Sequence, residues 1–173
     1  ADEQEQANMG DSATLQDFLS FCEKNYPADH RMFLFWDHGG GSVAGAACDE
    51  NYDYDALTLA EMDQAFSSVY RGQELPLELV GFDTCLMSTL DTANVFKKYA
   101  SYLVASEELE PGNGWSYNGW LHALGQNPRM NGAQLGTVIC DTFMEGCESY
   151  DTADEITLAV TDLKKLDKLL AAF

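Results

Sequence analysis

The chain contains 173 residues, of which 46% are hydrophobic and 12% aromatic, so it can bury the core of one globular domain. Nine Lys or Arg against 29 Asp or Glu give a net charge of -20, which argues against nucleic-acid or anionic-membrane partners and favours cationic ones. No segment reaches the ~18 apolar residues of a membrane span, and the polar residues 1–12 predict no signal peptide in this chain.

The cysteines predict neither a disulfide scaffold nor a zinc site. Their number is odd, so at least one thiol is free or paired outside the chain, and no C-x-x-C motif or zinc-like Cys/His spacing occurs. We therefore expect no metal ligands among them. The cysteines are Cys22, Cys48, Cys85, Cys140 and Cys147.

The N-terminal region predicts a helix followed by a buried strand. Residues 11–26 favour an amphipathic helix because Leu15, Phe18 and Leu19 recur at helical spacing. Residues 32–37 form a continuous apolar run, which is typical of a strand buried on both faces.

The middle of the chain continues with a loop, two helices and one strand. Residues 39–57 are rich in Gly, Ala, Asp and Asn and predict a long loop. Thr58 and Glu61 form a capping box at the start of a second helix. A second buried strand is expected at residues 77–83, with a helix over residues 86–99 directly after it.

The last third predicts a third strand at residues 101–106 and a loop over residues 107–119. The remaining expected elements are short helices around residues 118–125 and 132–147, a fourth strand at residues 155–163 and a final helix. Strands and helices therefore alternate along the whole chain. This order predicts an α/β fold with a mostly parallel sheet, helices on both faces, and a site beyond the carboxyl ends of the strands.

Reactive side chains follow two of the predicted strands. His38 and Gly39 come directly after the first strand, and Cys85 follows the second strand at the start of the predicted helix. A helix N-terminus favours a thiolate, and a neighbouring imidazole can act as acid and base. The N–H groups of Gly39 and Cys85 would then form an oxyanion hole.

A lipase-type site is a weaker interpretation of His38 and the three glycines after it. Such a site requires a G-x-S-x-G motif and a later catalytic histidine. The motif is absent, and the only later histidine, His122, lies on a predicted amphipathic helix. We interpret His122 and His30 as structural or surface residues.

Four stretches of the sequence, taken together, resemble the clostripain family of cysteine peptidases. They are "NMGDSATLQDFLSFCEKNYPADHRMFLFWDHGGG", "LVGFDTCLMSTLDTA", "VASEELEPGNGWSYNGWL" and "ITLAVTDLKKL". The resemblance implies a caspase-like three-layer sandwich, as in gingipains, legumains and caspases. It also implies a secreted or cell-envelope protein of a bacterium, which cleaves a basic peptide or protein substrate after Arg or Lys.

The resemblance implies roles for individual residues. Cys85 would be the nucleophile and His38 the general acid and base, while Asp83 matches the acid of the family's D-x-C motif at the primary pocket. Asn113 and Trp115 lie in the family's P-G-x-G-W loop and are expected to contact substrate. Asp83 as a helix cap is the alternative, in which case Glu107 or Glu108 would carry the specificity.

The sequence also departs from the family pattern. The first two strands of the family fold have no counterpart here, so we expect one domain over residues 1–173 that is a fragment or processed chain, with a companion chain supplying those strands. A catalytically silent caspase-like binding module is the competing function. No cofactor is expected to be required, although the acids of residues 48–55 leave calcium open; they lack the EF-hand spacing.

Overall fold

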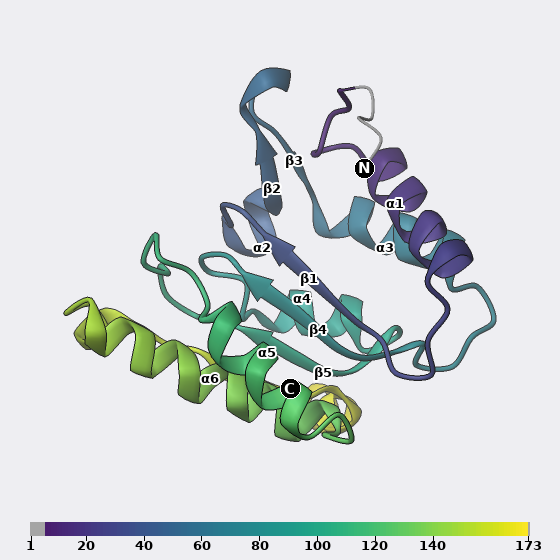
Figure 1. The fold of residues 1–173 in the computed structure, drawn as a ribbon. Coiled ribbons are helices and arrows are strands. Elements are labelled where there is room, and N and C mark those ends of the chain that lie inside the picture. The colour runs from purple at the N-terminus through teal and green to yellow at the C-terminus, as the bar shows by residue number, and fades with distance from the viewer. Residues whose placement is uncertain (1–5, 173) are drawn as a thin grey trace.

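The computed structural model describes residues 6–172, which form three layers (Figure 1). The central sheet has the order β1 (Met32–Trp36), β4 (Leu77–Asp83), β5 (Ala100–Ala105) and β6 (Ala159–Asp162). β1, β4 and β5 are parallel, and β6 is antiparallel to β5. The predicted α/β fold with a mostly parallel sheet and helices on both faces is therefore confirmed.

One face of the sheet is covered by α1 (Ser12–Asn25), α3 (Leu59–Val69), α4 (Leu90–Phe96) and α7 (Leu166–Leu170). The core on this side is largely aromatic. The rings of Phe35 and Phe82 are stacked with centroids 4.6 Å apart, and Phe66 and Phe96 contact each other edge to face. Such pairs add to the free energy gained by burying the rings.

The opposite face is covered by α5 (Tyr117–Gln126) and α6 (Gly132–Ser149), seen in green below the sheet in Figure 1. α6 approaches the sheet closely at Gly136, where an added Cβ would lie 2.9 Å from the side chain of Val160. Both helices were expected at these positions. None of the helices within residues 6–172 is long and apolar enough to cross a membrane.

The predicted N-terminal helix is confirmed, except that Phe18 is exposed instead of buried. Asp11 caps it by accepting a hydrogen bond from the Ala13 N–H, and Leu15 and Leu19 are buried. Phe18 was expected to face inward but is 53% exposed. It lies at the margin of the apolar stripe, where its ring contacts Phe33 edge to face.

The loop expected over residues 39–57 is wrong, because this segment is largely ordered. It contains α2 (Gly41–Ala44), β2 (Ala46–Asp49), the 3-10 turn η1 (Glu50–Tyr52) and β3 (Asp55–Leu57). β2 and β3 form an antiparallel pair with an irregular register. These strands are too short to produce a visible hydrophobic period, so only their pairing reveals them.

The helix expected from residue 86 begins later, at Leu90, and Leu90 itself is 43% exposed. Leu86 has a left-handed backbone (φ 65°), which a helix cannot include. Thr89 caps the helix instead, accepting a hydrogen bond from the Thr92 N–H. The fourth strand is likewise shorter than the predicted 155–163 and covers Ala159–Asp162. Two 3-10 turns, η2 (Ala153–Glu155) and η3 (Leu163–Lys165), flank it.

Candidate active site

The register of β1 and β4 sets the positions of His38 and Cys85. Trp36 pairs with Asp83 across the two parallel strands, and His38 and Cys85 each follow two residues later. Both therefore emerge at the same edge of the sheet, as expected from the sequence. The two side chains lie in the wall of one cavity of about 270 Å³.

Gly39 allows the two strand ends to approach each other. A Cβ atom at this position would lie 2.2 Å from the backbone oxygen of Cys85, which no side chain could tolerate. The N–H groups of Gly39 and Cys85 donate to no other described residue. Both donors are thus unused within the described residues, and their role as an oxyanion hole stays a prediction.

Cys85 does not lie at a helix N-terminus, so this part of the sequence interpretation is wrong. It occupies a turn between β4 and α4, and α4 begins at Leu90. Its sulfur instead accepts a hydrogen bond from the backbone N–H of Glu110, at 3.3 Å. A backbone donor on the loop after β5 therefore takes the place of the expected helix dipole at the thiol.

Asp83 is buried, with 4% of its surface exposed, at the carboxyl end of β4. Its Oδ1 accepts a hydrogen bond from the Trp115 N–H at 3.1 Å. Gly114 has a left-handed backbone (φ 58°), and a Cβ there would press on the carboxylate at 3.1 Å. Asp83 does not cap α4, since Thr89 does so; its side chain lies in the wall of the Cys85 cavity.

Glu110 is a candidate residue that sequence reasoning missed. Its carboxyl oxygens are buried and have no hydrogen-bond partner among the described residues. Burial, and then the negative charge of nearby Asp83, raise the pKa of Glu110 to about 9. Burial also raises the pKa of Asp83, against the hydrogen bonds that lower it. The cavity therefore contains two acids that hold protons unusually tightly.

The other acids of this loop, Glu107 and Glu108, are exposed and do not line the cavity. The loop is tied at Thr157, whose Oγ1 accepts hydrogen bonds from both of their N–H groups, at 2.9 and 3.2 Å. It is tied again at Cys85 through Glu110. These two contacts turn Glu110 inward, and no local pattern in the sequence would have distinguished it.

Asn113 and Trp115, which were expected to contact substrate, are not among the residues that line the Cys85 cavity. Trp115 is 3% exposed, and its ring packs against Gly81, where an added Cβ would lie 2.8 Å away. Asn113 is exposed, and its amide nitrogen lies 3.3 Å from the Gly114 oxygen and 3.9 Å from the Cys147 sulfur. Trp115 therefore packs the loop against the sheet, and contact of either residue with substrate stays a prediction.

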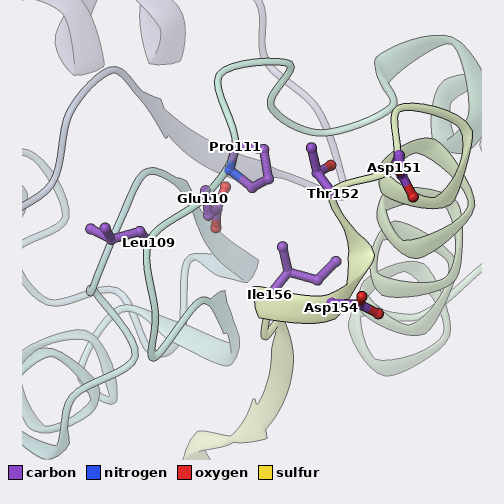
Figure 2. A pocket seen from close by; sticks show the side chains of 7 residues that line it. All are labelled: Leu109, Glu110, Pro111, Asp151, Thr152, Asp154 and Ile156. Carbon is purple, nitrogen blue, oxygen red and sulfur yellow. The ribbon is translucent and has the colours of Figure 1, made fainter.

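A second cavity, of about 470 Å³, shares Glu110 and Pro111 with the Cys85 cavity (Figure 2). The segment from Leu109 to Pro111 forms one wall, and the segment after α6 forms the opposite wall. The residues contributed by the opposite wall are Asp151, Thr152, Asp154 and Ile156. Glu110 therefore lines both the Cys85 cavity and this acidic recess.

The acids of residues 48–55 have other partners. Asp49 accepts a hydrogen bond from the Met9 N–H at 3.0 Å, and Asp55 accepts one from the Asn8 side chain at 2.6 Å. Within residues 6–172, no group of three or more His, Cys, Asp or Glu side chains is arranged to hold a metal ion. Calcium binding therefore stays a prediction from the sequence.

The parallel sheet, its helices on both faces and the cysteine and histidine at adjacent strand ends define a protein with the caspase-like fold. Residues 1–173 match the profile of the clostripain family, and the chain belongs to that family. Over 131 residues it is 30% identical to clostripain of Hathewaya histolytica, which covers 65% of this chain and 24% of that protein.

Two solved structures from Bacteroides thetaiotaomicron have similar folds. The first is a secreted C11 cysteine protease. Its match covers 94% of this chain and 48% of the protease chain, with 18% sequence identity and a TM-score of 0.78. The second is a clostripain in complex with the peptide inhibitor BTN-VLTK-AOMK. Its match covers 73% of this chain and 50% of the clostripain chain, with 25% sequence identity and a TM-score of 0.56. The chain spans about half, or less, of the length of these relatives.

Proposed function

We propose that this chain carries the catalytic centre of a cysteine endopeptidase that cleaves after Arg, with Lys as the second choice. The observation that supports the proposal most directly is the β1–β4 register, which brings Cys85 and His38 into the wall of one cavity. Membership of the clostripain family supports the same reaction class. The competing function, a silent binding module, requires that one of these two groups be idle.

The reaction follows from the groups in the cavity. The Cys85 sulfur attacks the carbonyl carbon of the scissile bond, and the carbonyl oxygen takes up the displaced electron pair. The N–H groups of Gly39 and Cys85 bind this oxyanion. His38 takes the thiol proton of Cys85 as the sulfur attacks and passes it to the leaving amine as the C–N bond breaks, which leaves a thioester. A water then attacks the thioester carbon while His38 accepts its proton. The C–S bond breaks, the acid product leaves, and the proton returns to Cys85.

The preference for a basic residue rests on Asp83. A buried carboxylate forms a strong, bidentate pair with a guanidinium, and a lysine ammonium can bind the same group as a point charge. The related clostripain with the VLTK inhibitor is consistent with a basic residue at this position. The shortage of Lys and Arg in the chain, nine residues against 29 acids, leaves the approach of a cationic substrate unopposed.

A direct test compares single variants on an Arg-containing peptide. Cys85→Ala and His38→Ala should each lower kcat/KM by roughly 10⁴-fold or more, since the nucleophile and its base act as a unit. Cys22→Ala is the matched control, because Cys22 lies on α1 outside the cavity and its loss should leave turnover intact. Loss of turnover in Cys48→Ala or Cys140→Ala, with Cys85→Ala active, would contradict the assignment.

We infer a location outside the bacterial cytoplasm, either secreted or in the cell envelope, because a structural relative is a secreted protease. Detection of the protein by antibody in culture medium or envelope fractions tests this inference. Recovery only with cytosolic markers would contradict it.

A further inference from the structure

Three carboxyl oxygens near Cys85 are buried without a well-aligned hydrogen bond. They are Oδ2 of Asp83 and both oxygens of Glu110. The neighbours that act on the pKa values of these acids are the Tyr117 hydroxyl, the Trp115 side chain and backbone, and the two carboxyls themselves, and none of them is a cation. Asp83 is more than nine-tenths buried. Both Asp83 and Glu110 line the cavity that contains the nucleophile. Unpaired polar atoms of this kind cost free energy, which a ligand with several donors would recover.

The groups around this pair carry no compensating positive charge. The described walls of the two cavities that share Glu110 include no Lys or Arg. The titratable groups that face the pair are neutral or acidic, or belong to the reaction itself. They are Tyr117 at the start of α5, Cys140 on α6, Asp151 and Asp154 after α6, and Asp37, His38 and Cys85 at the strand ends.

Two neighbouring buried carboxyls without a cation cannot both be ionised at low cost. Burial and the Asp83 charge raise the pKa of Glu110, so the pair retains one proton at neutral pH. A substrate guanidinium would reverse this balance, since it supplies the missing positive charge together with several N–H donors.

The position of Glu110 couples the pair to the reaction centre. Its backbone N–H donates to the Cys85 sulfur at 3.3 Å, while Asp83 precedes Cys85 by two residues. The two acids therefore approach the nucleophile from different elements, Asp83 from the end of β4 and Glu110 from the loop after β5. A basic side chain between them would be aligned from both sides.

We propose that Glu110 is a second specificity-determining residue, and that the Asp83–Glu110 pair exchanges one bound proton for the positive charge of the substrate side chain. This inference rests on the proposed peptidase function. In the free protein one carboxyl is ionised and the other protonated. Binding of one guanidinium ionises both carboxyls and releases one proton to the solvent, so the total charge is conserved.

Calorimetry of the full-length protein with butylguanidine tests this exchange without any peptide cleavage. The titrations are run at pH 7 in two buffers with different enthalpies of ionisation, which reports the protons released on binding. We expect about one proton per bound guanidinium, and an affinity that rises about tenfold per pH unit below the pKa of the pair. Glu110→Gln should bind with no proton release and no such slope.

The matched control is Glu107→Gln, an exposed acid of the same loop that should behave as the wild type. Failure of the wild type to bind butylguanidine, or binding without proton release, would overturn the inference, as would unchanged release in Glu110→Gln. Cleavage of Arg peptides is measured separately on the same preparations. Cleavage without proton release would reject the exchange alone, whereas proton release without any cleavage would reject the peptidase function alone.

Discussion

At the scale of single residues, the carboxylate of Asp83 shows how an acid can be kept in a buried pocket. The Trp115 N–H satisfies one oxygen, and Gly114 leaves room for the carboxylate because it has no Cβ. The second oxygen remains without a partner. An acid in this state is suited to a ligand and is of little use to the fold, since burial alone penalises its charge.

Asp83→Asn should therefore impair recognition and spare stability. We expect kcat/KM for Arg and Lys peptides to fall roughly 30- to 160-fold. This corresponds to a loss of about 2–3 kcal/mol of transition-state stabilisation, which is typical of a hydrogen bond to a charged group. The Tm should not fall, because the amide oxygen can still accept from Trp115. Kinetics with matched Arg and citrulline peptides measure the effect. An unchanged preference for Arg over citrulline would move the specificity role away from Asp83.

At the scale of elements, the segment after β1 packs closely against the turn after β4. Gly39 lies against the backbone of Cys85, and the bridge between Gly39 and Ala46 connects this strand end to the β2–β3 pair. The 39–57 segment therefore holds the histidine end of the site in place. This contact is between backbones, so no side-chain rearrangement can relieve a substitution there.

Gly39→Ala should separate the two strand ends and misalign Cys85 with His38. A displacement near 1 Å at a catalytic centre costs about 100-fold in rate, and we expect a loss of kcat/KM of at least that size. Gly125→Ala in α5 is the control, since a Cβ there meets no atom within 4 Å. Near-normal activity in Gly39→Ala would show that the strand ends can adjust, against the tight fit seen here.

At the scale of the whole molecule, β1 forms an edge strand of the central sheet. β1 pairs with β4 along one side, and on its other side no described residue forms a strand pair with it. Trp36, at the end of β1, is 73% exposed. An unpaired edge of this kind favours association with a further strand. The expectation that a companion chain supplies one stays a prediction.

The global stability should depend on pH through the buried acids. Glu110 has a pKa of about 9 when folded, far above that of an exposed glutamate, so between about pH 5 and 9 the folded state binds more protons than the unfolded state. The free energy of unfolding should therefore fall as pH rises across this range. Glu110→Gln should remove this contribution and be more stable than the wild type at pH 8.

Urea denaturation of both proteins at pH 5 and pH 8 measures this effect. The difference between wild type and variant isolates Glu110 from the general repulsion of a chain with net charge -20, since both proteins share that background. An equal difference at the two pH values would show that Glu110 titrates normally.

Local order was predictable where one physical pattern dominated. Continuous apolar runs identified β1 and β4, because strands buried on both faces exclude polar residues. The capping box identified the start of α3, since it satisfies backbone donors with neighbouring side chains. Both signals are local in the sequence, and the alternation of strands and helices then predicted the parallel sheet. The placement of His38 and Cys85 at one edge followed from that topology.

Which acid of the loop after β5 lines the cavity depends on contacts with distant segments. Glu107, Glu108 and Glu110 share one short segment, and their chemistry is the same. Hydrogen bonds to Thr157 and to the Cys85 sulfur turn the third of them inward. These partners lie about 50 residues after and 25 residues before the loop, so no local pattern records them.

Apolar periodicity and capping act over a few residues, so the sequence was enough to predict the four strands of the central sheet, most of the helices, and the strand ends that carry His38 and Cys85. It could not determine the pairing of β2 with β3, the late start of α4 or the meeting of Asp83 with Glu110. Those features depend on contacts between distant segments. Their free energies are realised only when the sheet has brought the segments together.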